Sequence, residues 1–188
     1  MTIGTLTWAR ALDHLDLVAP STAAALTAWA EHEPRVAHEV LVAQIDPELA
    51  DTAALTEAFE LPPSASVNCV LVAGRREGTE RVAAALVRAT TRADVNSTVK
   101  RLLDVRKCSF LPMDRATVES GMEYGGITPI GLPDDYRLLL DARVTVDDPD
   151  AGGLVVIGSG VRHSKIALPG ALLAAMPGVE VVDGLAIG

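Results

Sequence analysis

The residues best suited to chemistry lie in a glycine-rich stretch in the second half of the chain. Residues 119–133 read ESGMEYGGITPIGLP and contain four glycines and two prolines in 15 positions. This composition does not sustain a helix or a central strand, so we expect an ordered loop with free backbone amides. Pro129 fixes its own φ and biases Thr128 toward extended geometry. The amides of Gly125 to Thr128 could therefore be held for an anionic oxygen, and a purely structural turn is the alternative.

Other patterns in the sequence fit known reactive sites poorly. Gly158-Ser159-Gly160 follows an apolar run, where a dinucleotide fingerprint would begin, but the third glycine position holds His163. The tripeptide also fails as a nucleophile elbow, because Ile157 stands where the first glycine belongs. The four histidines are scattered, and both cysteines lack a second ligand at metal spacing. The sequence therefore predicts no metal site, no cofactor and no Ser-His-Asp or Cys-His constellation.

Charge is distributed unevenly along this acidic chain. The formal net charge is −9 at pH 7, which argues against general nucleic-acid binding, since phosphate contacts need a positive surface. Residues 61–115 nevertheless carry ten basic and five acidic side chains. These basic side chains could form a patch for a phosphate-bearing partner, and charge alone equally fits a solvated mixed surface. The residues expected to contact the phosphates of such a partner are Arg75, Arg76, Lys100, Arg101 and Arg106.

The chain is long enough to form one domain with its own core. It has 188 residues, of which 49% are hydrophobic and 3% aromatic. Ala, Val, Leu and Ile must therefore form the core, and no aromatic platform for single-stranded nucleic acid is expected. No apolar run reaches the roughly 18 residues of a membrane span, and the N-terminal stretch lacks a signal-peptide pattern. We expect a single cytoplasmic domain over residues 1–188 with no membrane partner.

Helical and strand patterns alternate along the chain. Apolar runs over 67–72 and 82–87 flank a glycine-containing turn and predict a β-hairpin. Further strands are predicted over 36–45, 107–111, 136–142, 154–157, 166–168 and 179–182. Helices are predicted over 20–33, 51–61, from Asn96 or Ser97 to 104, 114–120 and 169–176. Because these elements interleave without an internal repeat or linker, we predict an α/β domain built on a mixed sheet.

The motifs, taken in this order, resemble the YbaK/EbsC family, which is related to the editing domain of bacterial prolyl-tRNA synthetase. The resemblance covers roughly residues 25–184. It rests on the loop Gly125-Gly126-Ile127-Thr128-Pro129, on the strand that ends in Asp141, on VVIGSGVR from residue 155 and on the closing LPGALLA segment. It implies an α/β (α+β) fold in which a mixed, partly barrel-like sheet is surrounded by helices.

The resemblance also implies an activity, namely hydrolysis of the ester that joins a wrong amino acid to tRNA by a free-standing deacylase. Family members carry a catalytic lysine in the first strand of the hairpin, and the matching position here is Asn68. An amide donates a hydrogen bond but carries no charge, so it stabilises a developing anion less well. The alternative function is a catalytically weakened or silent binding module that holds an aminoacyl-tRNA end or a small ligand.

The implied site combines Asn68 with the glycine-rich loop. The residues expected to be catalytic are Asn68, Gly125, Gly126, Ile127, Thr128 and Pro129. The residues expected to bind substrate are Asp141, Gly158, Ser159 and Gly160. The implied partner is the acceptor end of a mischarged aminoacyl-tRNA, with an aminoacyl-tRNA synthetase as a further partner, and no cofactor or DNA is implied.

Overall fold

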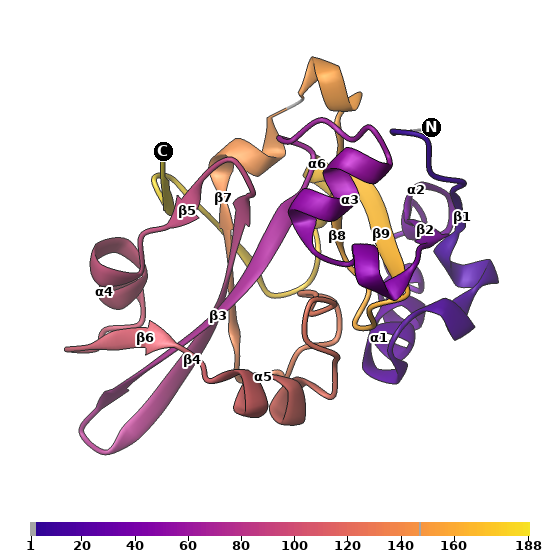
Figure 1. Ribbon diagram of the computed structural model, residues 1–188. Helices are drawn as coiled ribbons and strands as arrows, with labels where there is room; N and C mark the ends of the chain where they lie inside the picture. The colour runs from indigo at the N-terminus through magenta and orange to yellow at the C-terminus, as the bar shows by residue number, and fades with distance from the viewer. Residues whose placement is uncertain (1–2, 147) are drawn as a thin grey trace.

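Two main β-sheets form the framework of the protein, whose computed structural model describes residues 3–146 and 148–188. The first sheet contains β1 (Ala9–Arg10), β2 (Leu41–Gln44), β9 (Ser164–Pro169) and β8 (Leu154–Gly158), in that spatial order. The second contains β10 (Val179–Val182), β7 (Arg137–Asp141), β4 (Thr79–Arg88), β3 (Val67–Arg76) and β6 (Cys108–Phe110). A small pair joins β5 (Arg92–Ala93) to β11 (Ala186–Ile187). Figure 1 shows β2, β8 and β9 on the right and the β3–β4 hairpin with β7 on the left.

The two main sheets meet at a seam between β8 and the residues that lead into β3. A single parallel bridge pairs Ser66 with Val156, and the amide of Val156 donates to the carbonyl of Ala65 (2.9 Å). The second sheet is mixed, because β7 runs parallel to β4 and β10 whereas β3 runs antiparallel to β4 and β6. The predicted mixed, partly barrel-like fold is therefore confirmed, and the described strands do not close into a full barrel.

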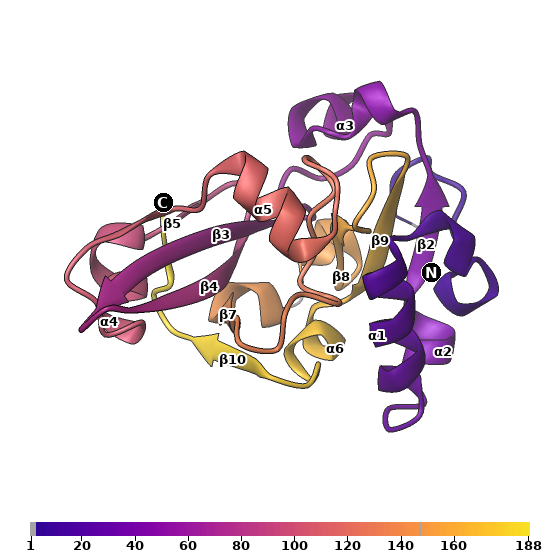
Figure 2. The same ribbon diagram turned by 90° about the horizontal axis from the view of Figure 1, so that it is seen from below.

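Short helices surround the sheets. They are α1 (Pro20–Ala30), α2 (Val36–Glu39), α3 (Thr52–Ala58), α4 (Lys100–Leu102), α5 (Met113–Ser120) and α6 (Gly170–Ala174), and a π-helical turn over Val95–Val99 leads into α4. Figure 2 places α1 and α2 beside β2, and α5 beside β3. No helix in the described ranges has both the length and the apolar character needed to cross a lipid bilayer.

The local predictions succeed where turn and cap chemistry is clear. The β3–β4 hairpin forms as expected, and α5 ends at Gly121 with φ of 67°. The strand predicted over 36–45 is wrong in its first half, where α2 forms, because a short apolar run fits either element. The helical turn over Val95–Val99 is capped by Asp94 rather than by Asn96 or Ser97, since the Asp94 carboxylate accepts from two amides of that turn.

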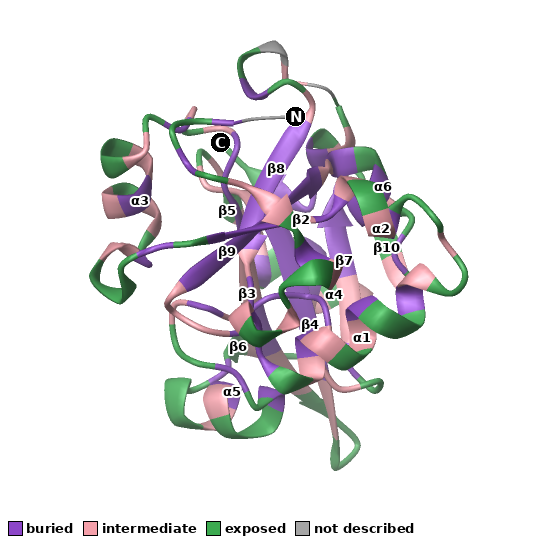
Figure 3. Cartoon of the chain, turned by 90° about the vertical axis from the view of Figure 1, so that its right-hand side faces the viewer, coloured by how far each residue is buried: buried purple, intermediate pink, exposed green. Residues whose placement is uncertain are grey.

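Aliphatic side chains form the core, as the composition requires. Figure 3 shows that β7, β8 and β9 are largely buried, whereas α3 and α5 expose much of their surface. The largest fully buried side chains include Leu86, Leu140, Ile157, Ile166 and Leu172. Close packing of this kind holds the strands that converge on the seam in fixed positions.

Candidate functional site

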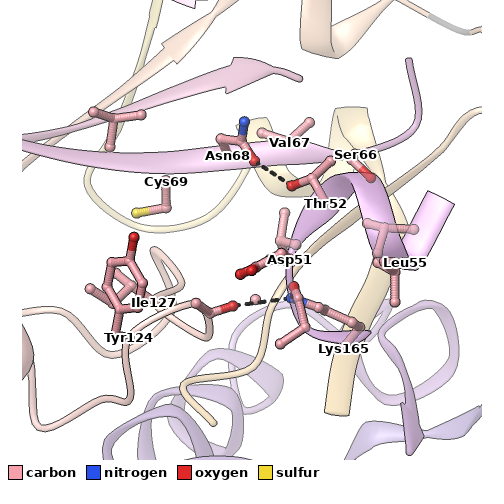
Figure 4. Close-up of a pocket in the computed structure, with 16 residues that line it drawn as sticks. Asp51, Thr52, Leu55, Ser66, Val67, Asn68, Cys69, Tyr124, Ile127 and Lys165 are labelled. Atoms are coloured by element: carbon pink, nitrogen blue, oxygen red, sulfur yellow. Dashed lines mark hydrogen bonds between the residues drawn. The ribbon is translucent and has the colours of Figure 1, made fainter. Parts of the chain in front are cut away.

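A pocket of about 290 Å³ opens at the seam between the two sheets. Its wall comes from the start of β3, the end of β8, β9, the beginning of α3 and the loop after α5 (Figure 4). The polar side chains that line it belong to Asp51, Thr52, Ser66, Asn68, Tyr124 and Lys165. The apolar part of the lining includes Leu55, Val70, Ile127 and Ile157. The pocket therefore combines an apolar wall with a few hydrogen-bonding groups, as small-molecule sites do.

Asn68, the residue at the implied catalytic position, lies in the β3 wall of this pocket. The hydroxyl of Thr52 donates to Oδ1 of Asn68 (3.1 Å; Figure 4). This contact fixes the side-chain amide and leaves Nδ2 of Asn68 with no partner among the described residues. Asn68 can therefore donate a hydrogen bond to a ligand oxygen.

Ser66 places a second uncommitted polar group in the same wall. Only 4% of Ser66 is exposed, and its Oγ has no hydrogen-bond partner among the described residues. A buried hydroxyl without a partner carries a free-energy cost. A bound ligand that hydrogen-bonds this hydroxyl would remove that cost.

Lys165 on β9 is the buried cation of the site, and the sequence reasoning missed it, as it missed Asp51, Thr52, Ser66 and Tyr124. It is 6% exposed, and its Nζ donates to the carbonyl oxygens of Ala50 (2.7 Å) and Gly125 (3.2 Å). Burial lowers the pKa of Lys165 to about 8, and Asp51 partly opposes that shift. One signal was available in the sequence, since a lysine inside an apolar strand is rarely buried without a special role.

The glycine-rich loop is joined to the Gly158-Ser159-Gly160 turn by backbone contacts. The amide of Glu123 donates to the carbonyl of Gly160 (2.9 Å), and the amide of Gly160 donates to the carbonyl of Gly126 (2.7 Å). A Cβ atom at Gly158 would overlap the carbonyl oxygens of Gly126 and Ile127. Glycine at these positions therefore permits the close approach of two backbones.

The expectation that the loop amides face the pocket is wrong for two of them. The amide of Gly126 donates to a carbonyl within the same loop (2.9 Å), and the amide of Thr128 donates to the sulfur of Met122 (3.5 Å). Buried backbone donors in a turn find partners, which is why these two are already used. Gly125 and Ile127 do line the pocket, and Gly125 offers its carbonyl oxygen to Lys165.

Several other expected site residues lie behind the pocket or apart from it. Gly158 lines the pocket, but Ser159 and Gly160 are not among the described residues that do. The hydroxyl of Ser159 is buried and donates to the carbonyl of Ser164 (3.0 Å). Pro129 instead lines a separate apolar groove beside α1.

Asp141, expected to bind substrate, lies at the end of β7 and is not among the described lining residues. Its carboxylate accepts hydrogen bonds from the amide and Nε of Arg143 (3.0 and 2.8 Å) and from the amide of Ala186 (2.8 Å). Burial alone would raise the pKa of Asp141, but these donors outweigh burial and lower the pKa. In this structure Asp141 connects β7 to the C-terminal segment.

A second hollow lies at the far end of β3 and is strongly basic. We name it the basic hollow. Its basic lining residues are Arg75, Lys100, Arg106, Lys107 and Arg115, and Glu80 is the one acid among its described lining residues. Three of the five residues predicted to contact tRNA phosphates therefore lie together. The aromatic ring of Phe110 is largely exposed at this hollow.

The other two predicted tRNA contacts lie outside the basic hollow. Arg76 forms ion pairs with Asp104 and with Glu77. Arg101 is exposed on α4 and is not among the described residues that line the hollow. The basic segment therefore divides into a group that converges and a group that does not.

The sequence model of the aminoacyl-tRNA editing domain matches residues 46–175. The chain belongs to this family. The matched range includes every residue that lines the pocket at the seam. The resemblance to the YbaK/EbsC family is thereby confirmed.

Solved structures share the fold at low sequence identity. A candidate trans-editing enzyme for prolyl tRNA synthetase is 18% identical, with a TM-score of 0.69 over 91% of this chain and 99% of that chain. The hypothetical protein APE2540 is 16% identical, with a TM-score of 0.70 over 87% of this chain and 99% of that chain. No curated protein matches the sequence significantly. At these identities the likeness establishes the fold.

Proposed function

We propose that this protein is a free-standing deacylase that hydrolyses the ester of mischarged aminoacyl-tRNA. Family membership supports this reaction. The observation on which the proposal depends is the set of hydrogen-bond donors that line the pocket at the seam. In the reaction, water adds to the ester carbonyl carbon, the bond from that carbon to the ribose oxygen breaks, and the ribose oxygen leaves with a proton. The pocket would hold the ester with its ribose oxygen within reach of Asn68, and a hydrogen-bond donor at the ester carbonyl oxygen stabilises the developing oxyanion.

The basic hollow supports tRNA as the form in which the ester arrives. Asn68 and Arg75 lie near opposite ends of β3, so they are separated by roughly 23 Å at about 3.3 Å per residue. Phosphate contacts fix the orientation of a bound nucleic acid without reading its sequence. We infer that the hollow binds the tRNA backbone while the acceptor end extends along β3 toward the pocket.

The direct test is hydrolysis of a panel of tRNAs that carry non-cognate amino acids. Because one structural neighbour is described in connection with prolyl tRNA synthetase, the proline tRNA charged with other amino acids is the first substrate to test. We expect amino-acid release above the uncatalysed rate from at least one mischarged tRNA and much slower release from the correctly charged ones. If no charged tRNA is hydrolysed, the deacylase proposal is wrong.

A binding module is the second candidate, because Asn68 supplies no charge at the position implied to be catalytic. Such a module would bind the charged acceptor end without turnover. Binding of charged tRNA in the absence of release would favour it. In either case we propose a cytoplasmic protein that meets mischarged aminoacyl-tRNA, with the synthetase that produced it as a further partner.

A further inference from the structure

The pocket at the seam contains two opposite charges whose environments differ. Among its described lining residues, Lys165 is the one cation and Asp51 is the one anion. Lys165 is almost fully buried, whereas the side chain of Asp51 is 71% exposed. Figure 4 shows both in the lower part of the pocket, opposite the wall that carries Asn68 and Cys69.

The hydrogen bonds of Lys165 leave one donor for a ligand. A lysine ammonium has three N–H donors and no acceptor. Two of these donors are directed to the carbonyl oxygens of Ala50 and Gly125, which both belong to the pocket wall. The third donor has no partner among the described residues. Because the ammonium is held by the backbone on two sides, its remaining donor is positioned in advance of ligand binding.

Asp51 is likewise available for a ligand. It occupies the N-cap position of α3, yet its side chain accepts no capping hydrogen bond there. The nearest cationic contact is Nη1 of Arg162, at 3.9 Å from Oδ1. This distance is long for a charge-assisted hydrogen bond. The carboxylate at the pocket mouth can therefore bind a second cation.

An α-aminoacyl ester presents charges that match this arrangement. Its ammonium group is attached to the carbon next to the ester carbonyl, so a positive group lies beside an oxygen that becomes negative during hydrolysis. We propose that Lys165 and Asp51 together recognise this head group, with Lys165 donating to the ester carbonyl oxygen and Asp51 accepting from the α-ammonium. The inference rests on the proposed function and specifies its substrate class as esters of amino acids with a free α-amino group.

The pH dependence follows from the groups that face Lys165. They are Asp51 before α3, Arg162 in the β8–β9 turn, and Tyr124 and Cys69 from the other lining segments. Burial lowers the pKa of Lys165 to about 8, Asp51 acts against this shift and Arg162 adds to it. Lys165 is therefore mostly protonated at neutral pH and loses its charge as pH rises through about 8. The rate enhancement that depends on Lys165 should decline over that range.

The test compares two variants on two substrates. Lys165→Met and Asp51→Asn are assayed on one mischarged tRNA with a free α-amino group and on the same tRNA with that amine acetylated, with the uncatalysed rate subtracted. We expect Lys165→Met to lower hydrolysis of both substrates about 10²- to 10³-fold. Asp51→Asn should lower hydrolysis of the free-amine substrate about tenfold and leave the acetylated substrate unchanged. Glu48→Gln, an exposed acid on the neighbouring turn, is the matched control and should change neither rate.

The ratio of wild-type to Lys165→Met rates provides the second readout. Because both proteins act on the same substrate, the ratio removes the substrate's own titration. It should be constant near neutral pH and fall above about pH 8. A ratio that rises with pH would show the neutral amine acting as a base and would overturn the assignment of Lys165 as a donor. Equal losses on both substrates in Asp51→Asn would overturn the assignment of Asp51.

A binding measurement separates this inference from the proposed function. The probe is an adenosine that carries an aminoacyl group through a 3′-amide, which is not hydrolysed as the ester is. If wild type hydrolyses no ester but binds this probe, and both variants lose binding, head-group recognition stands and the deacylase proposal fails. If wild type hydrolyses esters and Lys165→Met is as active, this inference fails alone. If wild type neither binds this probe nor hydrolyses any ester, both the inference and the deacylase proposal are wrong. Thermal melting confirms that each variant is folded.

Discussion

The two ends of strand β3 differ in how they hold charge. At its start, the pocket has one buried cation, and at its far end the basic hollow has five basic side chains, of which Arg75 is 73% exposed. Burial strengthens the interaction of a charge with its neighbours, whereas solvent and salt weaken the interactions of exposed charges. The pocket is therefore suited to act on reacting atoms, and the hollow is suited to hold a phosphate backbone through several weak contacts.

Among variants that keep Lys165 and Asp51, the largest expected effect comes from moving the pocket wall while leaving the basic hollow intact. In Gly158→Ala the new Cβ would overlap two backbone oxygens of the glycine-rich loop, so the loop must shift. Displacement of a positioning wall by about 1 Å lowers hydrolysis roughly 100-fold, and overpacking costs about 1–3 kcal/mol of stability. Affinity for tRNA should remain. Gly188→Ala, where a Cβ meets open space, is the control; unchanged hydrolysis in Gly158→Ala would show that this wall does not position the substrate.

A smaller effect is expected when the pocket loses one neutral donor. Asn68→Ala should lower the rate of hydrolysis roughly tenfold to 100-fold, with little change in melting temperature, because one donor of several is removed. Thr52→Val is the matched variant, since it removes only the hydroxyl that fixes Asn68. It should lower the rate of hydrolysis several-fold. If Asn68→Ala lowers the melting temperature and leaves hydrolysis per folded molecule unchanged, Asn68 is structural.

A change in the basic hollow should affect binding rather than chemistry. Arg106 and Lys107 reversed together to glutamate should raise KM about tenfold or more at low salt and leave kcat near the wild-type value. The slope of binding affinity against salt concentration should also become shallower, because fewer counterions are released. Fluorescence binding titrations at several salt concentrations measure this. Binding that is insensitive both to salt and to these reversals would contradict the assignment of the hollow.

The smallest effect on tRNA binding is expected at Arg76, which lies in the same basic segment of the sequence but outside the basic hollow. Arg76 is paired with Asp104 at the surface, and exposed pairs contribute about 0–1 kcal/mol. Arg76→Ala should therefore change stability little and weaken tRNA binding less than Arg106→Ala does. Equal losses of tRNA affinity in Arg76→Ala and Arg106→Ala would mean that the whole basic segment, rather than the basic hollow, contacts tRNA.

Local patterns in the sequence predicted the elements of the fold better than the content of the site. The β3–β4 hairpin and the end of α5 follow from apolar runs and glycines that are adjacent in sequence. The pocket depends on distant contacts, and the hydrogen bond from Lys165 to Ala50 joins residues 115 positions apart. The glycine-rich loop was expected as a loop, but Gly126 packs against the backbone of Val161 and Gly131 against the start of α1. Composition alone does not distinguish such packing from ligand binding.

The single bridge at the seam has a consequence for motion. β3 and β4 pair over ten residues, whereas the β-bridge that joins the two sheets within residues 3–146 and 148–188 pairs only Ser66 with Val156. Regions held by few hydrogen bonds open more easily than long ladders. The amide of Val156 should therefore exchange with deuterium faster than the central amides of the β3–β4 ladder. A ligand that contacts both sheets would slow that exchange, so the seam itself reports occupancy of the pocket.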